Sequence, residues 1–100
     1  MVAWDRVSRD DVVRAVEEYD RLGPVRFFSE HGFGLARGYQ LIYNHRPYAS
    51  KAILGVAYEF ATGQRLGSGD FEGGKNGAAA VLRKLGFEVQ DTRHTATPQT

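Results

Sequence analysis

Apolar and polar positions alternate at helical spacing in the first third of the chain and predict two consecutive helices. Ser8 is a favourable N-cap, and Asp10 and Asp11 follow it in the first turn, where negative charge interacts well with the helix dipole. The apolar positions that share one face are Val12, Ala15, Val16, Tyr19 and Leu22. We therefore expect one helix over residues 9–22 and, because proline suits a first helical turn, another over residues 24–31.

The period changes to two in residues 38–43, which predict a strand in which Tyr39, Leu41 and Tyr43 share a face. The Asn-His-Arg-Pro run that follows is typical of a turn. The remaining expected elements are a helix over residues 50–62 capped by Ser50, a helix over residues 76–85 and a strand over residues 87–89. The run 67–74 contains too many glycines for regular structure, and Phe71 is its one apolar anchor.

These patterns predict a small α+β domain with about four helices and a sheet of two or three strands. We expect this single domain to occupy residues 1–90 and residues 91–100 to form a flexible linker or tail. A chain of 100 residues, 42% hydrophobic and 25% charged, suits one compact core.

Composition removes several classes of function. The absence of cysteine excludes disulfides, thiolate catalysis and cysteine zinc sites, and three scattered histidines make a poor metal site, so we expect no metal and no cofactor. No apolar run approaches the roughly 18 residues that cross a bilayer, and the N-terminus lacks a signal-peptide layout, so the expected location is cytoplasmic.

Charge is distributed unevenly along the chain although the net charge is only +1. Residues 23–58 carry four cations against Glu30 alone, and these cations are Arg26, Arg37, Arg46 and Lys51. This is a weak electrostatic footprint for nucleic acid, since strongly DNA-binding domains are usually more basic.

Two expected helix starts combine backbone N–H groups with a cation. Ser50-Lys51 would place a hydroxyl and an ammonium at the positive end of a helix, a pattern that binds phosphate, although Ser50 as a plain cap and Lys51 as a solvated residue explain it too. Gly73-Gly74-Lys75-Asn76 lacks the Walker pattern but would let a backbone approach a phosphate. The two glycines are equally explained by a tight loop.

Aromatic and basic side chains interleave around the predicted turn. The tyrosines are Tyr39, Tyr43 and Tyr48, and the basic residues are Arg37, His45 and Arg46. Such a mixture suits stacking on exposed bases, while the alternative is that the tyrosines belong to the core. Arg46 in the turn is the hardest of them to assign to a core and is the best single candidate for a DNA contact.

Catalysis is not expected in this chain. Asp70 and Glu72 lie two residues apart in the glycine-rich loop, but no His-Asn-His arrangement or activated nucleophile accompanies them.

Several short runs together resemble a known family. They are the early Trp4, Phe-Phe-Ser-Glu-His-Gly-Phe-Gly at 27–34, Tyr-Ala-Ser-Lys-Ala-Ile at 48–53, Phe-Glu-Gly-Gly at 71–74 and Leu-Gly-Phe-Glu-Val at 85–89. The chain resembles the N-terminal head domain of McrA-like, modification-dependent HNH restriction endonucleases. The resemblance implies a non-catalytic module of a restriction system that cleaves modified DNA. It does not extend to nuclease or sulfur-reading segments.

We therefore expect a non-catalytic DNA-binding accessory domain of a type IV HNH restriction endonuclease that reads modified DNA. Its expected partners are duplex DNA and other domains of a parent nuclease, with no membrane. The residues predicted to contact DNA are Arg37, Tyr43, Arg46, Tyr48, Ser50, Lys51, Gly73, Gly74, Lys75 and Asn76. The alternative is a protein-docking or dimerisation module of the same enzyme, whose binding would be nearly indifferent to salt.

Overall fold

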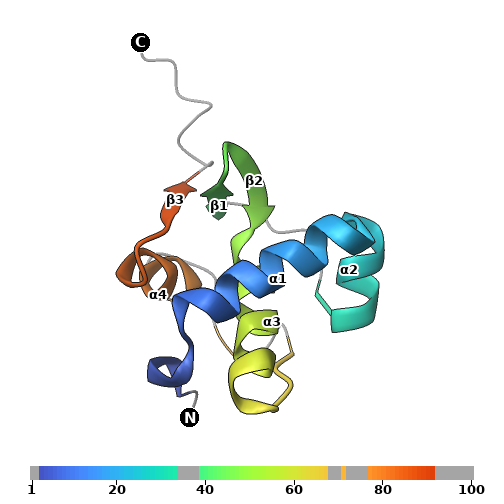
Figure 1. The fold of residues 1–100 in the computed structure, drawn as a ribbon, viewed down its shortest axis with the longest axis horizontal. Helices are drawn as coiled ribbons and strands as arrows, with labels where there is room; N and C mark the ends of the chain where they lie inside the picture. Colours follow the sequence, from blue (N-terminus) through green and yellow to red (C-terminus); the bar gives the residue numbers. More distant parts are fainter. Residues whose placement is uncertain (1–2, 34–38, 68–70, 72–76, 92–100) are drawn as a thin grey trace.

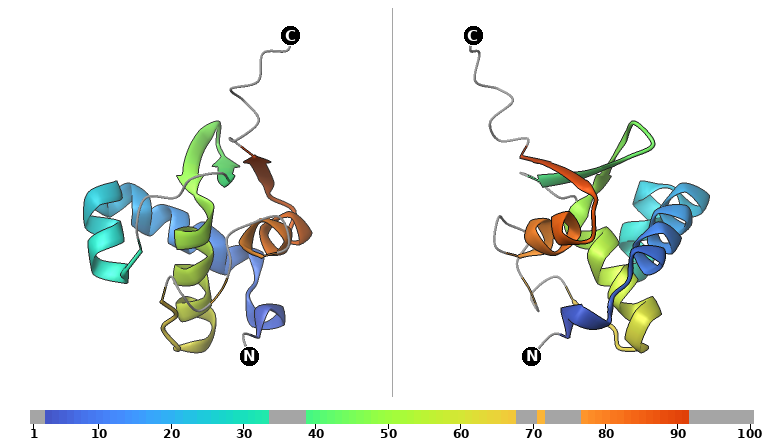
Figure 2. Two further views of the ribbon diagram at one scale, coloured as in Figure 1. Left: turned by 180° about the vertical axis from the view of Figure 1, so that it is seen from behind. Right: turned by 60° about the vertical axis from the view of Figure 1, so that its left-hand side comes forward.

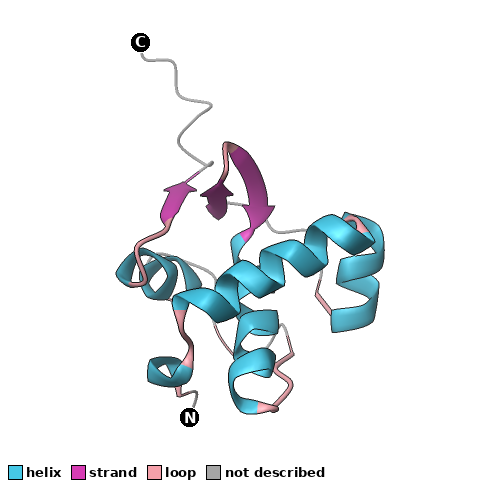
Figure 3. Ribbon diagram, viewed as in Figure 1, coloured by secondary structure: helices cyan, strands magenta, loops and turns pink. Residues whose placement is uncertain are grey.

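The computed structural model describes residues 3–33, 39–67, 71 and 77–91 and shows an α+β fold. Its elements are η1 (Trp4–Arg6), α1 (Arg9–Leu22), α2 (Pro24–His31), β1 (Tyr39–Tyr43), β2 (Arg46–Ala49), α3 (Ser50–Thr62), α4 (Ala78–Lys84) and β3 (Glu88–Asp91). The strands lie at one end of the molecule and the helices at the other (Figures 1 and 3). The predicted fold class is confirmed. Within the described residues, no helix is both long and apolar enough to cross a bilayer.

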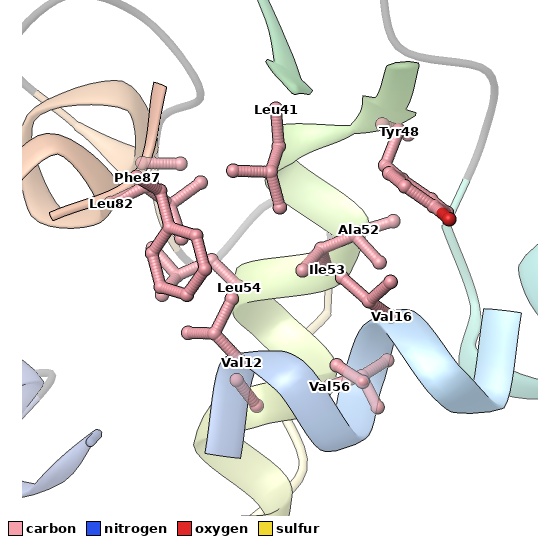
Figure 4. Close-up of a cluster of buried hydrophobic side chains, with 14 of the residues drawn as sticks. Val12, Val16, Leu41, Tyr48, Ala52, Ile53, Leu54, Val56, Leu82 and Phe87 are labelled. Carbon is pink, nitrogen blue, oxygen red and sulfur yellow. The ribbon is translucent and has the colours of Figure 1, made fainter. Parts of the chain in front are cut away.

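Helix α3 forms the centre of the packing. It is buried at Ser50 and at every position from Ala52 to Tyr58, so it contacts other elements on nearly all sides. Helix α1 packs against it through Val12 and Val16, as Figure 4 shows. Helix α4 closes another side, where Leu82 joins the same cluster.

The predicted bounds of α1 and α2 and the predicted end of α3 are correct because local signals mark them. Ser8 and Asp11 form a reciprocal capping box at the start of α1, Pro24 begins α2, and Gly63 ends α3 in a left-handed conformation at φ 78°.

The expected capping role of Ser50 is wrong. Ala49 precedes the first helical residue and makes no side-chain cap, while Ser50 is the first residue inside α3. Its Oγ donates to the carbonyl oxygen of Tyr39 at 3.1 Å, and the side chain is 1% exposed. The hydroxyl therefore satisfies the backbone of β1 rather than that of its own helix.

The sheet is antiparallel, in the order β2-β1-β3. Asn44 and His45 connect β1 to β2 with φ values of 52° and 66°, the left-handed conformations of a tight two-residue hairpin turn. The predicted turn is therefore shorter than four residues, because Arg46 already pairs with Tyr43 in the ladder. Strand β2 and the short helix η1 are elements that the periodicity did not predict.

The C-terminal elements are displaced slightly from the predictions. Helix α4 ends at Lys84 with Leu85 as its C-cap, and β3 begins at Glu88 rather than at Phe87. Phe71 does anchor its segment, because its ring centroid lies 5.1 Å from that of Trp4 and 6.1 Å from that of Phe33.

Gly55 provides a test of how tightly α3 is packed. A methyl group at this position would overlap the ring of Phe33, which is itself buried. We expect Gly55→Ala to lower the free energy of unfolding by about 1–3 kcal/mol, because overpacking outweighs the gain in helix propensity. Urea unfolding followed by circular dichroism would measure this. The double variant with Phe33→Leu should recover part of the loss, and a single variant as stable as the parent would contradict the packing.

Candidate nucleic-acid interface

Tyr48 links the hairpin to the end of α1. Its side chain is 3% exposed, and its hydroxyl donates to both carboxylate oxygens of Asp20, at 2.9 and 3.0 Å. Burial raises the pKa of the Tyr48 phenol, and the hydrogen bond to Asp20 raises it further. Tyr19 packs against the ring with a centroid separation of 5.0 Å. Tyr48 is thus an interior residue that holds the hairpin in place.

Arg46 lies beside this link and faces solvent. The exposed fraction of its side chain is 69%, and its Nη1 lies 3.8 Å from Asp20 Oδ1. Residues Asn44 to Pro47 are all exposed, so the tip of the hairpin is a polar projection. The carboxylate of Asp20 compensates part of the charge of Arg46.

Lys51 points toward a different part of the molecule. Its Nζ lies 5.3 Å from the centroid of the Phe71 ring, on the face of α3 that also carries Gly55 and Tyr58. Arg46 turns instead toward Asp20 of α1. Arg46 and Lys51, which were both predicted to contact DNA, therefore have different partners and do not form one site.

The remaining predicted site residues fall into two groups. Tyr43 is half-buried, with its ring centroid 5.9 Å from that of Phe87, and the Ser50 hydroxyl is bonded to β1 as described above. The others lie outside the described residues, and they are Arg37, Gly73, Gly74, Lys75 and Asn76.

A further group of cationic side chains lies outside the basic stretch 23–58 and was not predicted from the sequence. Arg9 at the start of α1 stacks on Phe87, with its guanidinium carbon 4.3 Å from the ring centroid, and donates to the carbonyl oxygen of Leu85 at 3.2 Å. Arg83 at the end of α4 donates to the carbonyl oxygen of Val89 at 2.7 Å. Arg9 thus joins the start of α1 to the residue that follows α4, more than seventy positions away, and α4 carries Arg83.

Arg6 and Lys84 add two further exposed cations to this region. We call Arg6, Arg9, Arg83 and Lys84 the cationic end. In the part of the chain that the structure describes, none of the four forms an ion pair with a carboxylate.

Two arginines of α1 and α2 are paired with carboxylates. Arg21 lies 2.6 Å from Glu18, and Arg26 lies 2.7 Å from Glu30. Arg14 of α1 stacks on Phe60 instead, with its guanidinium carbon 4.6 Å from the ring centroid. The cationic end therefore differs from the two paired arginines, because its side chains have no carboxylate partner in the described part of the chain.

His31 lies between two carboxylates rather than in a metal site. Its Nε2 is 3.4 Å from Glu18 and its Nδ1 is 3.8 Å from Glu59. No group of three acidic or histidine side chains suited to a metal ion occurs within the described segments. The hydrogen bond from Arg21 lowers the pKa of Glu18, burial opposes this, and the charge of Arg21 and the contact with His31 lower it further.

The fold and this distribution of charge define a small, helix-rich α+β domain with one cationic end. The chain belongs to the family described as the ScoMcrA-like N-terminal head domain, which matches residues 5–91. Among solved structures it is similar to the Type IV phosphorothioation-dependent restriction endonuclease ScoMcrA, with 30% sequence identity and a TM-score of 0.63. That similarity covers 95% of this chain and 14% of the other chain. No curated protein matches the chain.

The link between Tyr48 and Asp20 can be tested by removing one atom. Tyr48→Phe deletes the hydroxyl and leaves the ring packed, so the free energy of unfolding should fall by about 1–2 kcal/mol, as expected for a bond to a half-exposed charge. Tyr43→Phe is the matched control, since no described residue bonds to the Tyr43 hydroxyl, and it should have little effect. Urea unfolding of both variants measures the difference, and equal effects would refute a structural role of the bond.

Glu18 should make the free energy of unfolding depend on pH. Because the folded pKa of Glu18 is below its ordinary value of 4.5, its contribution is complete above that value and is lost as the pH falls through the lowered folded pKa. The difference in unfolding free energy between the parent and Glu18→Gln should therefore shrink on going from about pH 6.5 to about pH 3. Urea titrations at the two pH values measure it, and a constant difference would show that the carboxylate is not stabilised by Arg21.

Proposed function

We propose that this domain contacts DNA without cleaving it, as the head of a modification-dependent restriction endonuclease. The observation that carries the proposal is the cationic end, where four positive side chains lack carboxylate partners among the described residues. Phosphates are the natural counterions for such a surface, because guanidinium and ammonium groups without carboxylate partners gain from contact with a polyanion.

The contacts of Arg9 and Arg83 favour phosphate binding in addition to their contribution to the fold. Each guanidinium donates to a backbone carbonyl, which orients it without neutralising it. A cation held in one rotamer loses less conformational entropy when a phosphate binds. Arg6 and Lys84 are exposed and would reach phosphates further along the backbone.

The hairpin tip supplies a second proposed contact. Arg46 is exposed at the end of a short, rigid turn, and Asn44 and His45 beside it offer hydrogen-bonding groups. Tyr48 supports the tip from the interior, and Lys51 lies on another face. Contributions from Arg37, Gly73, Gly74, Lys75 and Asn76 stay predictions from the sequence.

Catalysis is proposed to lie in other parts of a longer enzyme. The similar restriction endonuclease is much longer than this chain, which spans 14% of it. The family resemblance implies an HNH nuclease segment beyond the head. We propose that the head and such other segments together recognise modified DNA, including phosphorothioated DNA.

The proposal predicts strongly salt-dependent binding of a short duplex. If four cations meet phosphates, the logarithm of the affinity should fall with the logarithm of salt with a slope of roughly −3 to −4 between about 50 and about 200 mM salt. Fluorescence anisotropy of the 100-residue chain with unmodified, base-methylated and phosphorothioated duplexes measures the slope and any preference.

A matched pair of variants assigns the binding to the cationic end. Arg6→Gln should reduce the steepness of the slope by about one and weaken binding to all duplexes alike. Arg21→Gln removes the same charge from a residue already paired with Glu18 and should change little. Binding that is absent at low salt, or equally sensitive to both substitutions, would refute the proposal and favour a protein-docking module.

A further inference from the structure

Helices η1 and α4 lie at the end of the molecule where α1 begins (Figure 1; Figure 2, right). Residues of both helices line a groove there. Its volume is about 450 Å³, within the range of small-molecule sites. It is lined by Trp4, Asp5, Val7, Ala80, Val81, Lys84 and Leu85.

The lining combines an apolar interior with one charge of each sign. Trp4 is the one tryptophan of the chain and is only half-buried. Its ring meets those of Tyr58 and Phe71 at 70° in both cases, with centroids 5.4 and 5.1 Å away. These contacts hold the indole in a fixed position while part of it remains open to the groove.

The surroundings of the groove indicate what it binds. Lys84 is itself a lining residue, and Arg6 follows the lining residue Asp5 in the same short helix. Arg9 donates to the carbonyl oxygen of Leu85, another lining residue. The groove thus has an aromatic wall and one lining cation, Lys84, which has no carboxylate partner among the described residues. Such a site complements a group that is flat and apolar at one end and anionic at the other.

We propose that this groove seats a nucleobase that has left its stack, from a bulge or a single strand. The base lies against the indole of Trp4, the ammonium of Lys84 meets its phosphate, and the carboxylate of Asp5 accepts a hydrogen bond from an exocyclic amino group. This assignment rests on the proposed function, and it adds a preference for unpaired nucleotides that phosphate contacts alone do not give.

Trp4 makes the assignment directly measurable, because a base stacked on an indole quenches its fluorescence. The experiment uses the 100-residue chain and two short duplexes of the same sequence, one fully paired and one with a single bulged adenine. Anisotropy of end-labelled duplexes reports binding, and Trp4 emission with unlabelled duplexes reports occupancy of the groove. We expect the bulged duplex to bind about tenfold more tightly, in line with one stacked base, and to quench Trp4 where the paired duplex does not.

Two variants separate the groove from the rest of the surface. Ala80→Phe places a ring in the groove from an exposed helical position, so it should remove both the quenching and the preference for the bulged duplex. Ser29→Phe adds the same ring to an exposed position of α2 and should retain both. Circular dichroism confirms that each variant is folded.

The outcomes distinguish this inference from the proposed function. Equal binding of the two duplexes with unchanged Trp4 emission would overturn the groove assignment and leave DNA contact by the cationic end intact. Quenching that survives in Ala80→Phe would also overturn it, since the base would then stack elsewhere. Failure of both duplexes to bind at low salt would overturn the proposed function and the groove assignment together.

Discussion

The burial of α3 is the constraint on which the rest of the structure depends. A helix buried on nearly every side needs partners all around it, and α1, α4, η1 and the sheet supply them. Phe33 fits only because position 55 is glycine, which shows how little free space remains. Since η1 and α4 are both placed by their contacts with α3, the groove between them and the cationic end are consequences of the same packing.

Polar residues near the start of α3 join the sheet to the helices. Ser50 satisfies a carbonyl group of β1, and Tyr48 reaches Asp20 at the end of α1. Both residues belong to the run that resembles the head-domain family most clearly, and in this structure their hydroxyls are occupied within the fold. A recognisable motif therefore marks the joint between hairpin and helix, while the exposed charge lies beside it on Arg46 and at the cationic end.

The sequence predicted the helices well because their ends carry local chemistry. Ser8 with Asp11, Pro24 and Gly63 specify termini through interactions within a few residues. Strand β2 was missed because Pro47 and the following short run have no alternation, and its pairing is fixed by the turn instead. The prediction that Ser50 caps α3 was also wrong because of a contact distant in sequence. The Ser50 hydroxyl donates to the carbonyl oxygen of Tyr39 in β1 instead.

The cationic end could not be predicted by counting charge along the chain. Arg6 and Arg9 lie in an acidic third of the sequence, and Arg83 and Lys84 in a neutral one, so only tertiary packing brings them together. The most direct test of DNA contact by the cationic end is an amide chemical-shift map of the labelled domain with a short duplex at low salt. If the cationic end binds DNA, the shifts are concentrated in η1, the start of α1 and the end of α4 and are reversed by salt; shifts confined to α2, or none, would contradict that contact.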